Sequence, residues 1–465
     1  MNWKSVISEQ QEALLKDLTH LLAIPSVKDL STQSETAPMG EQINKALLYM
    51  LKRAKTDGFR TKNIEGFIGF AEIGPADAED YIAILCHLDV VPATGDWTSD
   101  PYTPTIREGK LFARGAIDDK GPTMAAYYAI KLIKESGLPL KHRIRILFGT
   151  DEESGMSCMK KYVQVEQPAL TGFAPDAQFP IIHAEKGQIN LVLKGTQQHI
   201  SSESFNLCSF YSGEKGNMVP DYAVAIIQGK NLFLIEQLYT NFCMQNNLSF
   251  ATHHESEGIS LTMRGKSAHG MEPEKGINAA THLAKFLTTI IKENDFLNFI
   301  SHYLYEDPTG EQLQISFSDS ISGLLTVNPG VFRYSSQSGA SISLNIRCPI
   351  QTPYFRTIER ISEKAMLHHF NVDEIREKKP HHVDKNHPVI HILQQAYEVE
   401  TEEKAYLLTS GGATYAQFIK NGVAYGAAFP GKPYTAHQVD EYIELDDLFK
   451  ATAIYANAIY QLANM

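Results

Sequence analysis

Residues 81–86 form a continuous apolar run, and this run restricts the possible folds of the chain more than any other stretch. A strand that is apolar on both faces must be covered on both sides, as happens in the parallel sheets of α/β proteins. A second strand is indicated over residues 143–148, where apolar and basic residues alternate. Helical segments separate these strands, so the sequence predicts an α/β fold with a mostly parallel sheet and helices on both faces.

The sequence pattern changes after about residue 184 and returns to the first pattern near residue 384. The middle part mixes strand and helix signals in a way that is typical of α+β domains. A chain of 465 residues is long enough for two large domains. We therefore expect a catalytic domain made of residues 1–188 and 381–465, with an α+β domain, residues 189–380, inserted into it as a lid that binds substrate.

The charge and the cysteines narrow the class of protein. A formal net charge of -12 argues against a nucleic-acid surface, because phosphate contacts need clustered lysine and arginine. The five cysteines are scattered and form no Cys-x-x-Cys pair, which favours reduced thiols in the cytoplasm. No apolar signal core follows Met1, and no run approaches the ~20 apolar residues of a membrane span, so we expect no membrane partner.

Three consecutive acids, Asp151, Glu152 and Glu153, follow the strand at residues 143–148. Adjacent carboxylates repel one another unless they are solvated or paired with cations. One interpretation is a solvated acidic loop at the start of a helix, where negative charge is favourable. The other is a metal site, and it gains weight because further metal-ligating side chains follow other predicted strands.

Five positions carry such ligands: His87, Asp118, Glu153, Asp176 and His437. Taken singly, each could have an ordinary role such as a helix cap or a turn residue. The carboxyl ends of parallel strands converge, however, and imidazole with carboxylate but no thiolate suits zinc, manganese or cobalt. Five ligands exceed the usual three of one catalytic zinc, so we expect two divalent metal ions, with zinc preferred over manganese or cobalt.

In this arrangement the Asp118 carboxylate bridges the two ions. One ion is bound by His87 and Asp176, and the other by Glu153 and His437. Asp89 points the same way along its strand as His87. It could be a further ligand, but we expect it to accept a hydrogen bond that orients the imidazole.

Three motifs, in this order, resemble those of a known enzyme family: His-Leu-Asp at residues 87–89, Ala-Arg-Gly-Ala-Ile-Asp-Asp-Lys-Gly at residues 113–121, and Gly-Thr-Asp-Glu-Glu-Ser-Gly at residues 149–155. This is the dinuclear metallopeptidase family of carboxypeptidase G, aminoacylase, acetylornithine deacetylase and succinyl-diaminopimelate desuccinylase. Within it the chain looks most like the PepV-type dipeptidases of Gram-positive bacteria. Residues 118–123 and 180–182 are typical of that branch.

The resemblance implies a role for each matching residue of the catalytic half. Asp118, and not Asp119, is the bridging ligand, and the peptide bond between them is expected to be cis. In the acidic pair Glu152 is the general base and Glu153 a ligand. Glu152 would take a proton from the attacking water and return it to the leaving amine.

The resemblance also implies roles in the inserted domain. His269, in Ser-Ala-His-Gly, and Asn217 would stabilise the tetrahedral oxyanion. Arg347 would bind the substrate carboxylate through its guanidinium. Gly411 and Gly412 could add backbone N–H groups at a helix start. Because the PepV-type insert imitates the partner subunit of dimeric relatives, a monomer is expected.

The expected function is metal-dependent hydrolysis of unblocked dipeptides in the cytoplasm. An N-acyl-amino-acid deacylase would share the metal site and differ in the pocket. A catalytically silent metal-binding relative is a third possibility, although it would have no chemical need for Glu152 or His269. A nucleotide-binding protein is set aside, because no Gly-x-Gly-x-x-Gly follows the first strand.

Overall fold

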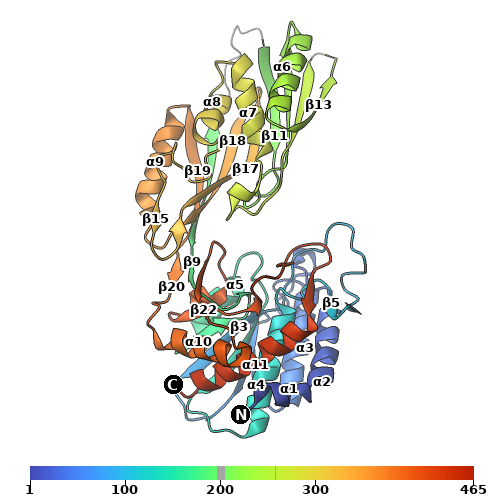
Figure 1. The fold of residues 1–465 in the computed structure, drawn as a ribbon, viewed down its shortest axis with the longest axis vertical. Helices are drawn as coiled ribbons and strands as arrows, with labels where there is room; N and C mark the ends of the chain where they lie inside the picture. Colours follow the sequence, from blue (N-terminus) through green and yellow to red (C-terminus); the bar gives the residue numbers. More distant parts are fainter. Residues whose placement is uncertain (196–204, 257) are drawn as a thin grey trace. The chain divides into compact units, whose positions relative to one another are not determined.

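A computed structural model describes residues 1–195, 205–256 and 258–465 of the chain (Figure 1). It divides into two compact units. The first contains Met1–Ala184, His382–Thr409 and Ala413–Met465, and the second contains Glu185–His381 and Ser410–Gly412. Residues 196–204 and 257, which fall within the predicted inserted domain, lie outside the described residues.

The first unit is an α/β domain. Its elements are α1 (Trp3–Ser8), α2 (Gln11–Leu22), η1 (Leu30–Thr32), α3 (Glu41–Thr56), β1 (Arg60–Ile64), β2 (Ile68–Ile73), β3 (Tyr81–His87), β4 (Thr105–Arg107), β5 (Lys110–Phe112), α4 (Lys120–Ser136), β6 (Arg143–Gly149), α5 (Ser157–Val165), β7 (Thr171–Ala174), β8 (Ala177–Gln178), β9 (Ile181–Glu185), α10 (Pro388–Thr401), η3 (Tyr415–Phe418), β22 (Gly422–Ala424), β23 (Ala427–Ala428), β24 (Tyr442–Glu444) and α11 (Leu445–Leu462). The strands β20 (His381–His382) and β21 (Leu407–Ser410) lie where the two units join along the chain.

The main sheet of this unit has the strand order β1-β2-β6-β3-β7-β22-β9. The central pairs β6–β3, β3–β7 and β7–β22 are parallel, whereas β1–β2, β2–β6 and β22–β9 are antiparallel. The expected α/β fold is confirmed. Parallel pairing is concentrated at the centre of the sheet, where the strands are apolar on both faces.

Alternate residues of β3 are buried in two different cores. Ile82 and Ile84 pack in a core with side chains from α1, α2, α3, α4, α10 and α11. Ala83 and Leu85 point to the other face and pack with side chains from α5 and η3. The continuous apolar run therefore reflects a strand covered by helices on both sides.

The second unit is built on one antiparallel sheet. Its elements are β10 (Gly187–Gly195), β11 (Phe205–Ser212), β12 (Tyr222–Gly229), α6 (Leu232–Gln245), β13 (Ser249–His254), β14 (Ile259–Arg264), η2 (Pro273–Lys275), α7 (Ala279–Ile290), α8 (Asp295–Tyr303), β15 (Ser318–Asp319), β16 (Gly323–Leu324), β17 (Thr326–Ser335), β18 (Gly339–Cys348), α9 (Tyr354–Met366) and β19 (Phe370–Lys378). The strand order is β13-β14-β12-β11-β17-β18-β10-β19, and α6, α7 and α9 contact this sheet (Figure 1).

The first two helices are separate, since α1 ends at Ser8 and α2 begins at Gln11. The chain turns there because α1 packs on α11 while α2 packs on α4. Near Gly411 and Gly412, where the sequence predicts a helix start, the structure has the short 3-10 helix η3, with Thr414 as its N-cap. In the part of the chain that the structure describes, no helix combines the length and the apolar character that crossing a membrane requires.

Candidate metal centre

The strand register brings three of the predicted site segments to one edge of the sheet. In the parallel pair β3–β6, His87 lies opposite Gly149, so the acidic residues begin directly after this position. Strand β7 pairs in parallel with β3 on its other side and leads to Asp176. The carboxyl ends of parallel strands meet at such an edge, which explains how residues far apart in sequence come together.

Asp118 lies at the centre of the cluster. Its Oδ1 is 3.0 Å from His87 Nε2, and its Oδ2 is 3.0 Å from His437 Nε2. His437 Nε2 is also 3.0 Å from Glu153 Oε1, and His87 Nε2 is 3.7 Å from Asp176 Oδ2. Each oxygen of Asp118 therefore faces a different imidazole, which is the arrangement a bridging carboxylate needs. The Asp118–Asp119 peptide bond is cis, as the family resemblance implied.

The cluster contains two sets of three residues, and within each set the ligand atoms all lie within 4.8 Å of one another. One set comes from His87, Asp118 and Glu153, and the other from His87, Glu152 and Asp176. Imidazole nitrogens and carboxylate oxygens, without thiolate, are donors that suit a divalent cation. The donor set therefore fits a metal ion.

The electrostatics of the cluster show why a cation suits it. Burial raises the pKa of the Glu152 carboxyl well above its ordinary value, and Glu153 adds to the shift although His87 opposes it. Burial lowers the pKa of His437, but hydrogen bonds to Asp118 and Glu153 outweigh this and raise it to about 11. Burial also opposes ionisation of Asp118, yet its hydrogen bonds with His437 and His87 hold its pKa far below the usual range. The carboxylates thus require positive charge at their centre, either on the imidazoles or on a bound cation.

His87 is oriented by the residue two positions later. Its Nδ1 lies 2.9 Å from the main-chain oxygen of Asp89, which can only accept a hydrogen bond. Nδ1 therefore carries the proton, and in the neutral ring the lone pair is on Nε2, on the side of Asp118. The Asp89 carboxylate is farther away, with Oδ1 3.6 Å from Nδ1. The main-chain oxygen is thus the nearer acceptor, and not the side chain that the sequence suggested.

The Asp89 carboxylate instead holds the acidic segment. It accepts hydrogen bonds from the backbone N–H groups of Glu152 and Glu153, each at 3.1 Å. Asp89 thereby links the imidazole of His87 with the loop that carries the two glutamates.

Asp151, the first of the three acids, has a structural role, because its carboxylate binds neighbouring side chains and backbone and is not part of the ligand cluster. Its carboxylate accepts hydrogen bonds from Lys28 Nζ at 2.8 Å and from the Ser157 N–H at 2.9 Å, as well as from the Ser154 hydroxyl. The side chain is almost completely buried. The sequence analysis gave roles to Glu152 and Glu153 only, and it missed the ion pair of Asp151 because Lys28 is distant in the chain.

Glu441 is a second residue that sequence reasoning missed. Its Oε1 accepts hydrogen bonds from the backbone N–H groups of Ile117 and Asp118 at 3.0 and 3.2 Å. Its Oε2 pairs with Arg114 Nη1 at 2.5 Å. No local pattern points to a contact across more than 300 residues, although an arginine in the Asp118 motif was a signal that a buried acid could be its partner.

In the second unit, the structure places Asn217 beside His269. The Gly270 N–H donates to the Asn217 main-chain oxygen at 2.7 Å, and Met218 forms a β-bridge with His269. The Met271 N–H donates to His269 Nδ1 at 3.2 Å. Nδ1 is therefore the acceptor, so in the neutral ring the proton is on Nε2, which can act as a donor.

Arg347 belongs to β18, where Leu344 and Ile346 face the helix-covered core and Arg347 points to the opposite face. Its Nε donates to Asn345 Oδ1 at 3.0 Å and its Nη1 to the main-chain oxygen of Gly411 at 2.7 Å. Burial lowers the pKa of Arg347 to about 10. An anion beside this guanidinium would therefore stabilise its charged form.

The Gly411–Gly412 turn has a different geometry from the one expected. The Gly412 N–H donates to Ser410 Oγ at 2.9 Å, and the carbonyl of Gly411 accepts from Arg347. The 3-10 helix that follows, η3, begins at Tyr415 and is capped by Thr414, so the N–H groups of Gly411 and Gly412 do not lie at its start as expected. The turn instead contributes to holding the guanidinium.

Comparison with known proteins gives consistent results. The model of the family "Peptidase family M20/M25/M40" matches residues 83–461. A Bacillus subtilis protein named "Putative dipeptidase YtjP" is 43% identical over 100% of both chains, and a Staphylococcus haemolyticus protein, also named as a dipeptidase, is 38% identical over 99% of both. Among solved structures, the dipeptidase Dug1p of Saccharomyces cerevisiae covers 100% of this chain and 98% of its own, with a TM-score of 0.61 and 11% identity. The aminopeptidase PepT of Bacillus cereus covers 98% and 99%, with a TM-score of 0.59 and 17% identity. These two structures support the fold.

Proposed function

We propose that this chain, which belongs to peptidase family M20/M25/M40, hydrolyses the peptide bond of unblocked dipeptides. Membership of the family makes it a metal-dependent hydrolase, and its full-length relatives carry the name dipeptidase. The observation that carries the proposal is the convergence of His87, Asp118, Glu153, Asp176 and His437 around one centre with Glu152 beside it.

Two divalent cations would be held by these residues, with zinc preferred and manganese or cobalt as alternatives. His87 and Asp176 would bind one ion, Glu153 and His437 the other, and Asp118 both. The two different imidazoles that face the oxygens of Asp118 support this division. When bound, the cations would polarise the scissile carbonyl and lower the pKa of a water molecule.

Glu152 would move the proton. As general base, its carboxylate would take one proton from the attacking water and deliver it to the nitrogen of the leaving amine as the C–N bond breaks. The hydrogen bond from its N–H to Asp89 Oδ1 fixes the backbone from which this side chain extends. A fixed backbone keeps the carboxylate in reach of both the water and the leaving group.

Residues of the second unit would bind the substrate. His269, whose Nδ1 accepts from Met271, would donate its Nε2–H to the developing oxyanion together with Asn217. Arg347 would bind the substrate's C-terminal carboxylate, and the carbonyl of Gly411 would hold its guanidinium in place. We expect the protein to act as a cytoplasmic monomer, without a nucleic-acid or membrane partner.

The test is a small substrate panel. The protein is stripped with a chelator, reloaded with zinc, manganese or cobalt, and given a free dipeptide, a tripeptide and an N-acyl amino acid. Metal-dependent cleavage of the dipeptide alone is the expected result. Cleavage of only the N-acyl compound would make the protein a deacylase, and metal uptake without turnover would make it a catalytically silent relative.

A further inference from the structure

The ion pair of Arg114 and Glu441 lies directly behind the predicted bridging ligand. Arg114 is 2% exposed and Glu441 is fully buried. The glutamate uses one oxygen for Arg114 Nη1 and the other for the N–H groups of Ile117 and Asp118. It therefore holds the backbone of the residue whose side chain lies at the centre of the cluster.

The same glutamate belongs to the segment that carries His437. Strand β24 begins at Tyr442, one residue after Glu441, and Tyr442 pairs with Phe112 of β5. The Ala113 N–H also donates to the main-chain oxygen of Glu441 at 3.1 Å. The segment with Asp118 and the segment with His437 thus meet at one buried carboxylate.

The backbone around His437 depends on such support. His437 has φ 64° and Asp440 has φ 55°, in the left-handed region that side-chain-bearing residues rarely adopt. Residues persist in this region when the surrounding structure determines their conformation. Asp440 is held by the Thr98 N–H at 2.9 Å, and Glu441 is held by Arg114.

We propose that Glu441, paired with Arg114, is a positioning residue that fixes Asp118 and His437 relative to each other. It thereby sets the affinity of the ion that these two residues share. This inference rests on the proposed two-ion centre.

A role in stability alone does not explain the pair well. Burying two charges costs desolvation energy, and apolar side chains of similar volume often stabilise a fold equally or better. A carboxylate, by contrast, can accept from three donors in the arrangement seen here, and an N–H group left without an acceptor would be costly. The hydrogen bonds to Ile117 and Asp118 therefore point to a role in geometry.

Metal titration of the stripped full-length chain tests the inference. Isothermal titration calorimetry with zinc, and the absorption spectrum with cobalt, report the number of ions and the affinity of each. In Glu441→Gln we expect one ion to bind about 10–100-fold more weakly, as is usual when a group that supports a ligand is lost. The other ion should lose less affinity, because only one of its three ligands, the bridging Asp118, belongs to the segments that Glu441 joins.

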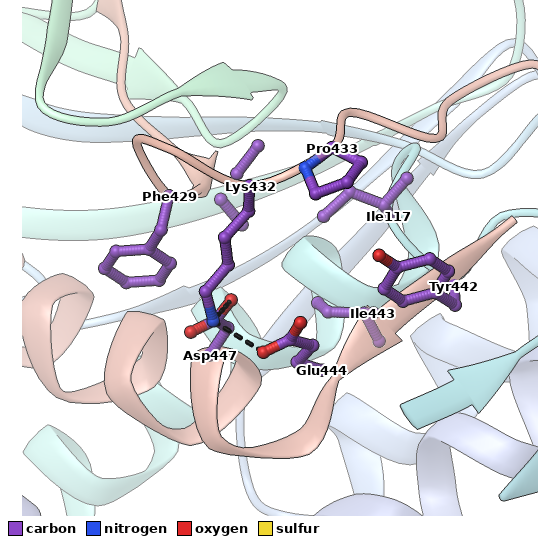
Figure 2. Close-up of a pocket in the computed structure, with 10 residues that line it drawn as sticks. Ile117, Phe429, Lys432, Pro433, Tyr442, Ile443, Glu444 and Asp447 are labelled. Atoms are coloured by element: carbon purple, nitrogen blue, oxygen red, sulfur yellow. Dashed lines mark hydrogen bonds and ion pairs between the residues drawn. The ribbon is translucent and has the colours of Figure 1, made fainter. Parts of the chain in front are cut away.

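Glu444→Gln is the matched control. Glu444 lies three residues later, and its carboxylate pairs with Lys432 at 2.5 Å, next to Asp447 (Figure 2). This variant removes a negative charge from the same part of the chain without touching Asp118. Both ions should bind to it as they do to the wild type.

A double variant separates positioning from stability. Replacing both partners, as in Arg114→Met with Glu441→Met, removes the buried charges together and should recover much of any loss in the Tm of the metal-free chain. The affinity of the shared ion should stay low. Wild-type affinities in Glu441→Gln, or a double variant in which Tm and affinity recover together, would overturn the inference. A wild-type chain that binds only one ion would instead overturn the two-ion proposal.

Discussion

Replacing Arg347 by glutamine tests whether this guanidinium selects substrates with a free C-terminal carboxylate. The side chain is 4% exposed and is held by Asn345 and Gly411. Glutamine keeps a polar side chain but loses the charge. The change should therefore weaken carboxylate binding without abolishing the chemistry at the metal centre.

The expected loss follows from the type of interaction. A hydrogen bond to a charged group contributes about 1.5–3 kcal/mol, and about 1.4 kcal/mol corresponds to a factor of ten in rate. Burial already lowers the pKa of Arg347 to about 10, so the positive charge of this guanidinium is poorly compensated within the protein. The hydrogen bond to a substrate carboxylate should therefore contribute an energy at the upper end of this range. We expect kcat/KM for a free dipeptide to fall by roughly 100-fold.

The assay compares a dipeptide with the same dipeptide carrying a C-terminal amide. The wild type should prefer the free acid, and Arg347→Gln should lose most of this preference while cleaving the amide at an almost unchanged rate. Arg376→Gln is the control, because Arg376 lies on β19 of the same sheet with a side chain that is 79% exposed. An equal loss for both substrates in Arg347→Gln would refute the carboxylate role and indicate a general defect of the second unit.

Three further variants test other parts of the structure. Glu152→Gln should bind metal normally and lose about 10²–10⁴-fold in kcat, and near-normal turnover would exclude Glu152 as the base. Asp89→Ala should weaken metal binding about 10–100-fold in a chelator competition assay, because it frees the Glu152–Glu153 segment, and unchanged affinity would contradict this. Burial raises the pKa of Glu166, but the hydrogen bonds from Lys62 and Arg145 outweigh burial and lower this pKa below its ordinary value. The ionised Glu166 carboxylate therefore stabilises the fold above the unfolded pKa of ~4.3, and this stabilisation is lost as the pH falls through the lower folded pKa. Glu166→Gln should therefore reduce the fall in Tm between about pH 5 and pH 3, and an identical fall would contradict the shift.

The location of the site could be predicted because the β-strand pattern determines it. A strand that is apolar on both faces implies a covered parallel sheet, and the carboxyl ends of such strands lie together. His87 and the acids after Gly149 could thus be expected at one place, and the register His87–Gly149 agrees. Asp118 and His437 do not directly follow a strand of this sheet. Their residue types made them candidate ligands, and the family resemblance supported that choice.

The supporting residues could not be predicted, because their partners are determined by the folded backbone. Asp151 and Glu152 are neighbours with the same charge, yet one is bound to Lys28 and Ser157 and the other lies beside His87 and Asp176. The motif resemblance assigned Glu152 and Glu153 to the metal site, but nothing in the sequence indicated the partners of Asp151. Those partners depend on the path of the chain after the strand.

Glu441 is a second supporting residue that could not be predicted from the sequence. The N–H groups of Ile117 and Asp118 need an acceptor once they are buried, and any acidic residue in the last part of the chain could have supplied it. What selects Glu441 is the pairing of β24 with β5, which brings its carboxylate to the start of the Asp118 segment. A site of this kind therefore consists of ligands that a motif can reveal and of supporting residues that only the strand pairing reveals. Variants of the supporting residues are the sharper test of the structure, since the motif alone would not have suggested them.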